Sequence, residues 1–320
     1  MKGRKVKMTN QVKTVMLLSI FSMILAACGG NDETNQGKND DKLQVTSSFT
    51  IISDMAREIG GDKVEVHNLV PTGTDPHEYE PLPEDTKQAT DADILFYNGL
   101  NLEGGDDGWF SRLVDSVDQN EDHVISLTER VDPKYLEEDE TDETQINPHG
   151  FIDPGVGIKM AEDMRDALME VDADHADYYE EQGDKYVDRL KEIEEDYDER
   201  LGDLPEENKT LVTSECAYSY LLDHYDMDEA CIWKIDTEEN GSPQQIKSLI
   251  SFIKDHEVPQ LFLESNVDER PMETVSEESG VDIFDKPIYS DEIGEPGEEV
   301  DTYVKYLKYN IEVIEEGLSD

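Results

Sequence analysis

The sequence predicts an α/β protein of two lobes, each built on a parallel sheet, joined by a long rigid helix with a cleft between the lobes. Two observations carry this prediction. Short apolar or alternating strand patterns are followed by segments with helical spacing, and this succession occurs twice along the 320-residue chain. One long helical segment without proline separates the two series. Strands and helices that alternate in this way favour parallel sheets covered on both faces.

The first series forms the N-terminal lobe, which we assign to residues 43–172. Its expected elements are a strand at 43–49, a helix at 51–59, a strand at 63–70, a helix at 83–92 and a short apolar strand at 93–97.

The second series forms the C-terminal lobe, which we assign to residues 204–320. Its expected strands lie at 210–213, 230–235, 260–264 and 281–284, and its expected helices at 215–224, 243–256, 269–279 and 300–317.

A linking helix is expected between the lobes, at 173–203. Up to Leu201 this segment contains no proline and one glycine, Gly183, and its aromatic and aliphatic residues recur mostly at three- and four-residue steps. A helix of that length is about 45 Å long at 1.5 Å per residue. One interpretation is an ordinary packed helix, and the other is a rigid helix that connects the two lobes. Because no Gly/Ser hinge is present, the pattern favours limited lobe motion over wide closure.

The N-terminus has the pattern of a bacterial lipoprotein signal. Basic residues without acids precede an uncharged run at 14–27, which is shorter than the roughly 20 residues that span a bilayer. The residues Leu25-Ala26-Ala27-Cys28 resemble a lipobox, which implies a signal peptide at 1–27 and a lipid on the Cys28 sulfur. A polar tether then follows at 28–42. The alternative is an ordinary signal peptide with an incidental cysteine. The protein is therefore expected outside the cytoplasm, anchored to the outer face of the cell membrane.

The charge balance is strongly acidic. The chain has 79 Asp and Glu against 27 Lys and Arg, a formal net charge of −52. This excludes a nucleic-acid binder that works through a basic face. Our hypothesis is an acidic surface adapted to high salt, where screening weakens self-repulsion; generic weak cation binding by surface acids is the competing explanation. With three cysteines, neither a disulfide-stapled scaffold nor a zinc site of four thiolates is available.

Four potential metal ligands lie in loops at expected strand ends, where open parallel sheets bind their ligands. His77 lies in a Pro/Gly-rich loop, and His149 precedes a helix. Glu215 lies where a strand becomes a helix, and Asp291 follows the last strand. Two imidazoles and two carboxylates, two from each lobe, are therefore positioned to meet across the cleft.

Each candidate also has a plainer explanation. A lone loop histidine is usually exposed, Glu215 suits the positive end of a helix dipole, and Asp291 is one of many acids. Glu264, at a strand end, is interpreted as a nearby hydrogen-bond partner. Cys216 and Cys231 either form a disulfide or remain buried thiols. The other histidines, interpreted as structural or surface residues, are His67, His123, His175, His224 and His256.

Several long motifs accompany the four candidates. They are DPHEYEP at 75–81, GLNLE at 99–103, WKIDTEENGSP at 233–243, LFLESNVDERPMETVS at 261–276 and TYVKYLKYN at 302–310. Together they resemble the cluster A-I solute-binding lipoproteins of metal ABC transporters, especially the manganese-binding members related to the pneumococcal surface adhesin, in the ZnuA/TroA-like superfamily. The resemblance covers nearly all of the mature chain and implies a metal buried between two lobes.

The resemblance implies that His77, His149, Glu215 and Asp291 are the metal ligands. Family members more often carry Asp where this chain has Asn147, and a small residue where it has Cys216. Neither difference removes a ligand, although each changes the surroundings of one.

The donor set favours Mn²⁺ as the bound ion, because carboxylate oxygens suit this harder cation and a third imidazole would favour Zn²⁺. Zinc-specific relatives commonly carry His in place of Glu215, often with a His-rich acidic loop. Here the acidic segment 131–145 contains no histidine. Zn²⁺ and Fe²⁺ remain alternatives, since Zn²⁺ stands above Mn²⁺ in the Irving-Williams order.

The function that follows is capture of the ion and its delivery to an ABC permease and its ATPase, by a monomeric protein without enzymatic activity. Acid is expected to release the metal, because protonated imidazoles cannot coordinate it. Three alternatives stay open. They are a zinc-transport component, a surface adhesin and a lipid-anchored metallohydrolase, which would need an open coordination position.

Overall fold

The computed structural model describes residues 42–137, 144–235, 241–256 and 258–319. The expected signal peptide at 1–27, the expected lipidation site Cys28 and all of the tether except Lys42 lie outside these residues. Among the residues described, no helix has the length and apolar character needed to cross a membrane.

The N-terminal lobe is built on a parallel sheet with the strand order β2-β1-β3-β4. Its strands are β1 (Leu43–Phe49), β2 (Val64–Val70), β3 (Ile94–Tyr97) and β4 (Val124–Ser126). In the centre, Val45 of β1 pairs with Val66 on one side and Ile94 on the other. The last five residues of β1 are all buried, as expected for a strand covered on both faces.

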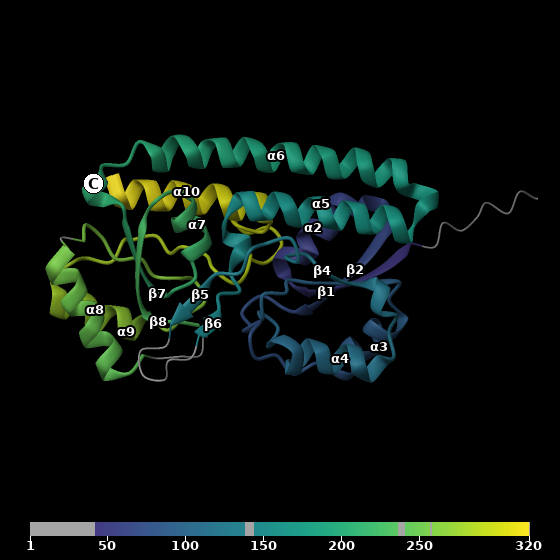
Figure 1. Cartoon of the computed structure of the whole chain (residues 1–320), viewed down its shortest axis with the longest axis horizontal. Coiled ribbons are helices and arrows are strands. Elements are labelled where there is room, and N and C mark those ends of the chain that lie inside the picture. Colours follow the sequence, from purple (N-terminus) through teal and green to yellow (C-terminus); the bar gives the residue numbers. More distant parts are fainter. Residues whose placement is uncertain (1–41, 138–143, 236–240, 257, 320) are drawn as a thin grey trace, which may run out of the picture. The chain divides into compact units, whose positions relative to one another are not determined.

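Helices cover both faces of this sheet (Figure 1). They are α2 (Thr50–Gly60) and α5 (Pro154–Val171) on one face, and α3 (Pro83–Asp91) and α4 (Trp109–Val117) on the other. The start of α5 has a clear local cause, because the Asp153 carboxylate accepts a hydrogen bond from the Val156 N–H at 2.9 Å and Pro154 occupies the first turn.

The linking segment forms helix α6 (Ala176–Gly202), preceded by a 3₁₀ turn at Ala173–His175. The helix runs along α5 and α10 (Tyr303–Ser319) (Figure 1). The Tyr197 hydroxyl donates a hydrogen bond to the Leu307 carbonyl of α10 at 2.8 Å. The buried side of α6 therefore packs against α5 and α10. The lobe boundaries at 172 and 204 remain predictions from the sequence.

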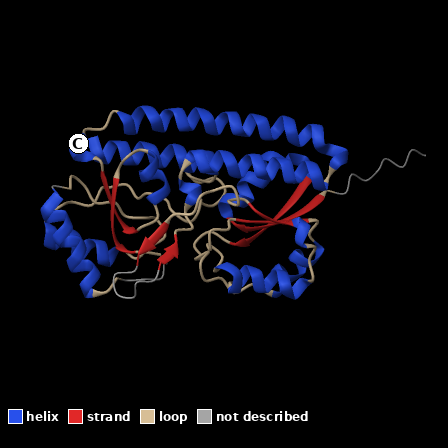
Figure 2. Ribbon diagram, in the orientation of Figure 1, coloured by secondary structure: helices blue, strands red, loops and turns tan. Residues whose placement is uncertain are grey.

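The C-terminal lobe contains a second parallel pair, β7 (Thr210–Glu215) and β8 (Asp228–Trp233) (Figure 2). The segment 261–264 lies beside β7, since the Phe262 N–H donates to the Val212 carbonyl at 2.9 Å. Parallel bridges then join Leu261 to Ile283 and Glu264 to Ile288. The segments 260–264 and 281–284, which the sequence predicts to be strands, therefore pair only through isolated β-bridges and do not form continuous strands.

The remaining elements of the second half surround this pair. They are the helices α7 (Ser219–His224), α8 (Pro243–His256) and α9 (Glu269–Ser279). The antiparallel strands β5 (Tyr135–Glu137) and β6 (Thr144–Ile146) belong to the segment assigned to the N-terminal lobe. The helix expected from residue 215 begins at Ser219, because Glu215 is still paired with Trp233 of β8.

The larger of the two hydrophobic cores formed by the described residues is shared by both lobes. It includes Phe49 of β1, Tyr197 of α6, Tyr306 of α10 and Phe262 beside β7, all buried. A smaller core lies beneath α8 and α9 and includes Trp233. Because moving the lobes apart would disrupt close packing in the shared core, the architecture favours small relative motions.

We expect the fold to need salt. In the described residues many acids of α6 are exposed on the side away from α5 and α10, and the screening length shrinks from about 10 Å at 0.1 M salt to about 3 Å at 1 M. Dilution from 2 M to 0.1 M NaCl should lower Tm by roughly 10 °C, which corresponds to about 6 kcal/mol for a chain of this size. Thermal unfolding followed by circular dichroism measures this change. Equal Tm at both salt concentrations would contradict the high-salt hypothesis, and recovery by millimolar Mg²⁺ would favour weak cation binding by surface acids.

Candidate metal centre

The first candidate, His77, lies in the loop between β2 and α3. The His77 N–H donates to the Asp75 carboxylate at 2.7 Å. On either side of it, the Trp109 indole donates to the Pro76 carbonyl at 2.8 Å, and the Tyr79 hydroxyl donates to Asp85 at 2.7 Å. The loop that carries His77 is thus attached to α4 and α3.

The second candidate, His149, is fully buried just before α5. The Asn147 side-chain oxygen accepts from the His149 backbone N–H at 3.1 Å and lies 2.8 Å from the ring Nδ1. Since an amide oxygen only accepts, Nδ1 carries the proton, and the lone pair of the neutral ring is on Nε2. Asn147 therefore turns the coordinating nitrogen of His149 toward the other candidates.

The third candidate, Glu215, is the last residue of β7 and is fully buried. Its backbone N–H donates to one oxygen of Glu264 at 2.8 Å, and the Ser214 N–H donates to the other at 3.1 Å. Burial raises the pKa of Glu264 to about 7, although these two donors act in the opposite direction. Glu264 thus holds the end of β7, which agrees with its expected role as a hydrogen-bond partner.

The fourth candidate, Asp291, lies in the loop between the Ile288 bridge and α10. The Asn266 amide donates to its Oδ2 at 3.1 Å, and the Ser290 hydroxyl does so at 3.2 Å. Burial is the largest single influence and acts to raise the pKa of Asp291, but His149, His77 and the Asn266 amide together outweigh it and hold this pKa below its usual range.

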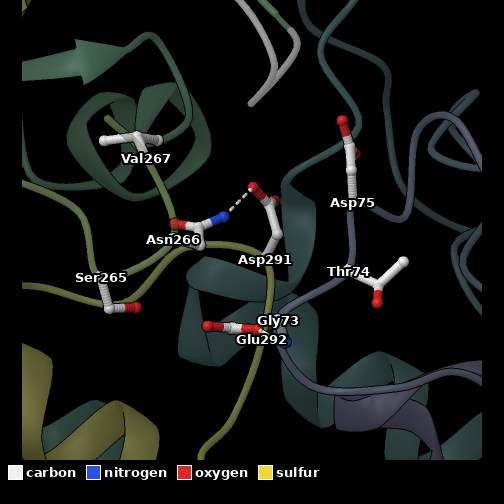
Figure 3. A pocket seen from close by; sticks show the side chains of 8 residues that line it. All are labelled: Gly73, Thr74, Asp75, Ser265, Asn266, Val267, Asp291 and Glu292. Atoms are coloured by element: carbon white, nitrogen blue, oxygen red, sulfur yellow. Dashed lines mark hydrogen bonds between the residues drawn. The ribbon is translucent and has the colours of Figure 1, made fainter.

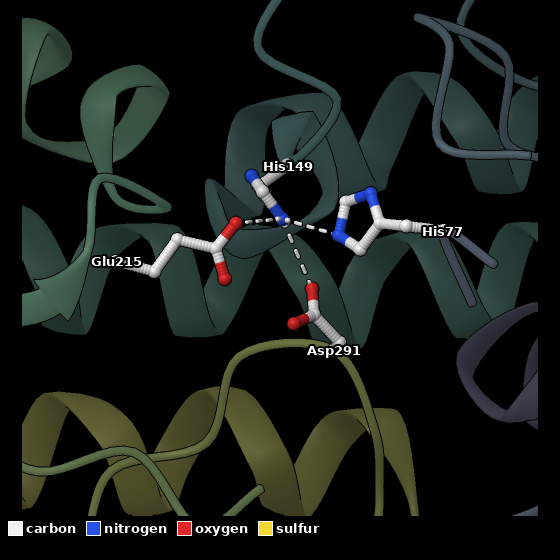
Figure 4. Close-up of side chains that lie close together, drawn as sticks. All are labelled: His77, His149, Glu215 and Asp291. Carbon is white, nitrogen blue, oxygen red and sulfur yellow. Dashed lines mark hydrogen bonds and ion pairs between the residues drawn. The ribbon is translucent and has the colours of Figure 1, made fainter. Parts of the chain in front are cut away.

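The four side chains converge on one point (Figure 4). One ligand atom from each of His77, His149, Glu215 and Asp291 lies within 4.8 Å of the other three. From the His149 Nε2, the distances are 3.1 Å to Asp291 Oδ1, 3.3 Å to His77 Nε2 and 3.5 Å to Glu215 Oε1. Tetrahedral ligands at about 2.1 Å from a cation are about 3.4 Å apart. The spacing therefore fits a bound transition-metal ion.

The charges at this point also fit a divalent cation. Glu215 and Asp291 are almost completely buried, and two buried carboxylates are costly without compensating positive charge. Two neutral imidazoles and two carboxylates around a doubly charged ion give a formal charge of zero. Within the described residues, this is the group of histidine, cysteine and acidic side chains arranged to hold a metal.

A cavity of about 350 Å³ borders Asp291 (Figure 3). Its lining comes from both lobes and consists of Gly73, Thr74, Asp75, Ser265, Asn266, Val267, Asp291 and Glu292. The Gly73 N–H donates to the Glu292 carboxylate, which joins the His77 loop to the segment carrying Asp291. This polar, acidic lining suits the passage of a cation toward the four candidates.

The comparisons with known proteins agree with this geometry. The family model described as zinc-uptake complex component A, periplasmic (ZnuA), matches residues 45–317. The chain belongs to this family. The ZnuA family model thus spans both lobes and all four candidate ligands, as the resemblance in the sequence motifs implied.

Relatives within the family have closely similar lengths. The metal ABC transporter substrate-binding lipoprotein SsaB of Streptococcus sanguinis is 40% identical over 307 residues, 96% of this chain and 97% of that protein. The manganese ABC transporter substrate-binding lipoprotein PsaA of Streptococcus mitis is 39% identical over 306 residues, 95% and 97% of the two chains. A Mn-bound mutant of a periplasmic metal-binding protein from Candidatus Liberibacter asiaticus is 25% identical, with a TM-score of 0.76, and the match covers 87% of this chain and 100% of that one.

Two features near the site were not evident from the sequence alone. The structure joins Cys216 and Cys231 in a disulfide with a Cα–Cα distance of 5.3 Å, which decides between the two alternatives for these cysteines. Asn147 makes contacts in both lobes, since its Nδ2 donates at 2.9 Å to the Cys216 carbonyl and to the Ser219 hydroxyl. The sequence around Asn147 does not indicate these contacts between the lobes; it shows only that Asn147 lies two residues before His149.

Replacing Asn147 with alanine should weaken metal binding about 10- to 100-fold, the usual cost of losing a partner that orients a ligand. The variant loses the acceptor for the His149 Nδ1–H and the donor to Cys216. Titration against a competing chelator measures the affinity, and Asn120→Ala, which removes an exposed cap of a 3₁₀ turn, is the matched control. An affinity equal to that of the unchanged chain would contradict an orienting role for Asn147.

Proposed function

We propose that this protein is the solute-binding lipoprotein of an ABC importer, and that it captures Mn²⁺ outside the cytoplasm and delivers it to the permease and its ATPase. The observation that carries the proposal is the buried group of two imidazoles and two carboxylates, His77, His149, Glu215 and Asp291. The names of the relatives, which describe manganese ABC transporter lipoproteins, agree with it. The ion is cargo, so the protein needs no catalytic step and is not an enzyme.

Mn²⁺ is proposed over Zn²⁺ because half of the donors are carboxylates. Carboxylate oxygens suit Mn²⁺, whereas a site richer in imidazole would favour Zn²⁺. Zn²⁺ is the second candidate, because the family model carries a zinc-uptake description and Zn²⁺ binds most N/O sites more tightly than Mn²⁺. Which of the two ions the protein carries then depends on its ligand types and on the concentrations of Mn²⁺ and Zn²⁺ available to it.

Capture requires only local rearrangement of the chain. The ion would pass the acidic cavity beside Asp291 and reach the lone pairs of the two neutral imidazoles, after which ligands from both lobes enclose it. The core shared by Phe49, Tyr197 and Tyr306 limits how far the lobes separate. The loaded protein then presents a surface that differs from the empty form by a small movement of its loops.

The test is the metal content of the full chain purified in salt-rich buffer, followed by competition between Mn²⁺ and Zn²⁺. We expect about one Mn²⁺ per chain, and no bound metal in the His77→Ala variant. Zinc that is retained against excess manganese would transfer the cargo assignment to Zn²⁺. A chain that takes up neither ion in stoichiometric amount would refute the transport proposal.

The lipid anchor has its own test. Cys28 is proposed as the lipidated residue, with cleavage after residue 27. In the producing cells, the Cys28→Ser variant should move from the membrane fraction to the medium while it keeps its metal affinity. Fractionation with immunoblotting measures this change. A Cys28→Ser variant that stays on the membrane would show that the anchor lies elsewhere.

A further inference from the structure

The disulfide lies directly beside the candidate metal centre. Cys216 follows Glu215 in the chain, and its bond to Cys231 attaches the loop after β7 to the interior of β8. The Cys216 N–H also donates to the Trp233 carbonyl of β8 at 3.1 Å. The backbone after Glu215 is thus attached to the neighbouring strand by a covalent bond and a hydrogen bond.

Cys216 also connects to the other lobe. Its carbonyl accepts from the Asn147 amide at 2.9 Å, and the same Asn147 orients the ring of His149. The buried Cys216 is therefore adjacent in sequence to Glu215, and it is linked through the Asn147 side chain to His149 in the opposite lobe. A shift of the Cys216 backbone would change the position of Glu215 and remove the partner that holds Asn147.

We propose that the Cys216–Cys231 disulfide is a positioning element of the metal centre, and that breaking it lowers the affinity for Mn²⁺ while the chain stays folded. The inference rests on the proposed metal-binding function. The closed loop contains α7, so the bond restricts the backbone on both sides of that short helix. Restricting a ligand in its binding position lowers the ordering cost of coordination.

The fold is expected to survive reduction because other contacts hold the same region. The Glu264 carboxylate still accepts from the N–H groups of Ser214 and Glu215, and β7 still pairs with β8. What reduction removes is the constraint on the residue after the ligand. The effect should therefore appear in metal affinity and in the geometry of the bound ion.

The experiment compares three forms of the full chain in salt-rich buffer. They are the oxidised chain, the chain reduced with a phosphine and then desalted, and the Cys216→Ala/Cys231→Ala double variant. Mn²⁺ affinity is measured by chelator competition, and the electron paramagnetic resonance spectrum of bound Mn²⁺ reports the symmetry of its ligands. We expect an affinity about tenfold lower and a changed spectrum in both disulfide-free forms, with far-UV circular dichroism retained.

Val275→Ala is the matched control. Val275 of α9 is buried in the same smaller core as Trp233, but it belongs neither to the four-donor group nor to the disulfide. This variant should lower Tm and leave the affinity and the spectrum unchanged. An equal loss of affinity in Val275→Ala would assign the effect to general stability and overturn the inference.

The possible failures are distinguishable. If the oxidised chain binds no Mn²⁺, the proposed function fails. If the oxidised and reduced chains bind Mn²⁺ equally well with the same spectrum, the proposed function stands and the positioning role is refuted. If the double variant does not fold, the comparison of oxidised and reduced wild-type chains decides.

Discussion

Replacing Glu215 with alanine is expected to lower the affinity for Mn²⁺ by at least roughly 100-fold, because loss of a partner that only orients a ligand already costs about 10- to 100-fold. The side chain is fully buried, and its Oε1 lies 3.5 Å from the His149 Nε2, so its truncation removes one of the four converging donors. The remaining donors would be two imidazoles and Asp291, which leave a doubly charged ion with one counter-charge. Isothermal titration of the apo chain with Mn²⁺ measures the change.

A change of Glu215 to histidine is the sharper test, because it keeps a donor in place and changes its type. Three imidazoles and one carboxylate should favour Zn²⁺, so the ratio of Zn²⁺ to Mn²⁺ affinity should increase relative to the unchanged chain. Glu292→Gln is the control, since Glu292 lines the adjacent cavity but lies outside the four-donor group and its amide can still accept from Gly73. If Glu292→Gln lost Mn²⁺ as strongly as Glu215→Ala, the ligand assignment would be wrong.

The sequence predicts three of the four strands of the N-terminal sheet and the linking helix, because their signals are local, and it misses the short strand β4. The alternation at 43–49 and the three- and four-residue steps of 176–202 are each produced by burial of one side of a regular element, which leaves its period in the chain. The four candidate ligands could also be selected, since strand ends of parallel sheets gather at one edge. Their convergence within 4.8 Å adds the geometry that the sequence lacks.

What the sequence could not predict depends on distant partners. Helix α4 (Trp109–Val117) has a short apolar side that packs into the larger core, and its Trp109 donates to the carbonyl of Pro76 in a distant loop. Glu215 has the properties of a helix start, yet its pairing with Trp233 and its bond to Glu264 keep it in the strand. Long-range contacts of this kind leave no period in the chain.

Without metal, the chain is expected to be most stable in mild acid. Burial raises the pKa of Asp54 to about 6, although the Tyr303 N–H at 2.8 Å acts in the opposite direction. Burial likewise raises the pKa of Glu103 to about 7 against the donors Asn98 N–H and Gly99 N–H. Both groups bind protons more tightly in the folded chain than in the unfolded chain. Their stabilising contribution is therefore complete below about pH 4 and is lost as the pH rises through 6 to 7.

The expected size of this loss is about 3 kcal/mol for each group, since each shift of one pKa unit corresponds to about 1.4 kcal/mol. Urea unfolding of the chelated chain at constant molar salt, between pH 4.5 and 8, measures it. Asp54→Asn keeps an acceptor for the Tyr303 N–H and removes the titration, so its free energy of unfolding should fall by about 2 kcal/mol less across this range. A stability that rises with pH in the unchanged chain would mean that these carboxylates are ionised in the folded state. Metal binding should have the opposite pH dependence, because Mn²⁺ competes with protons for His77 and His149, so the loaded chain gains stability where the empty chain loses it.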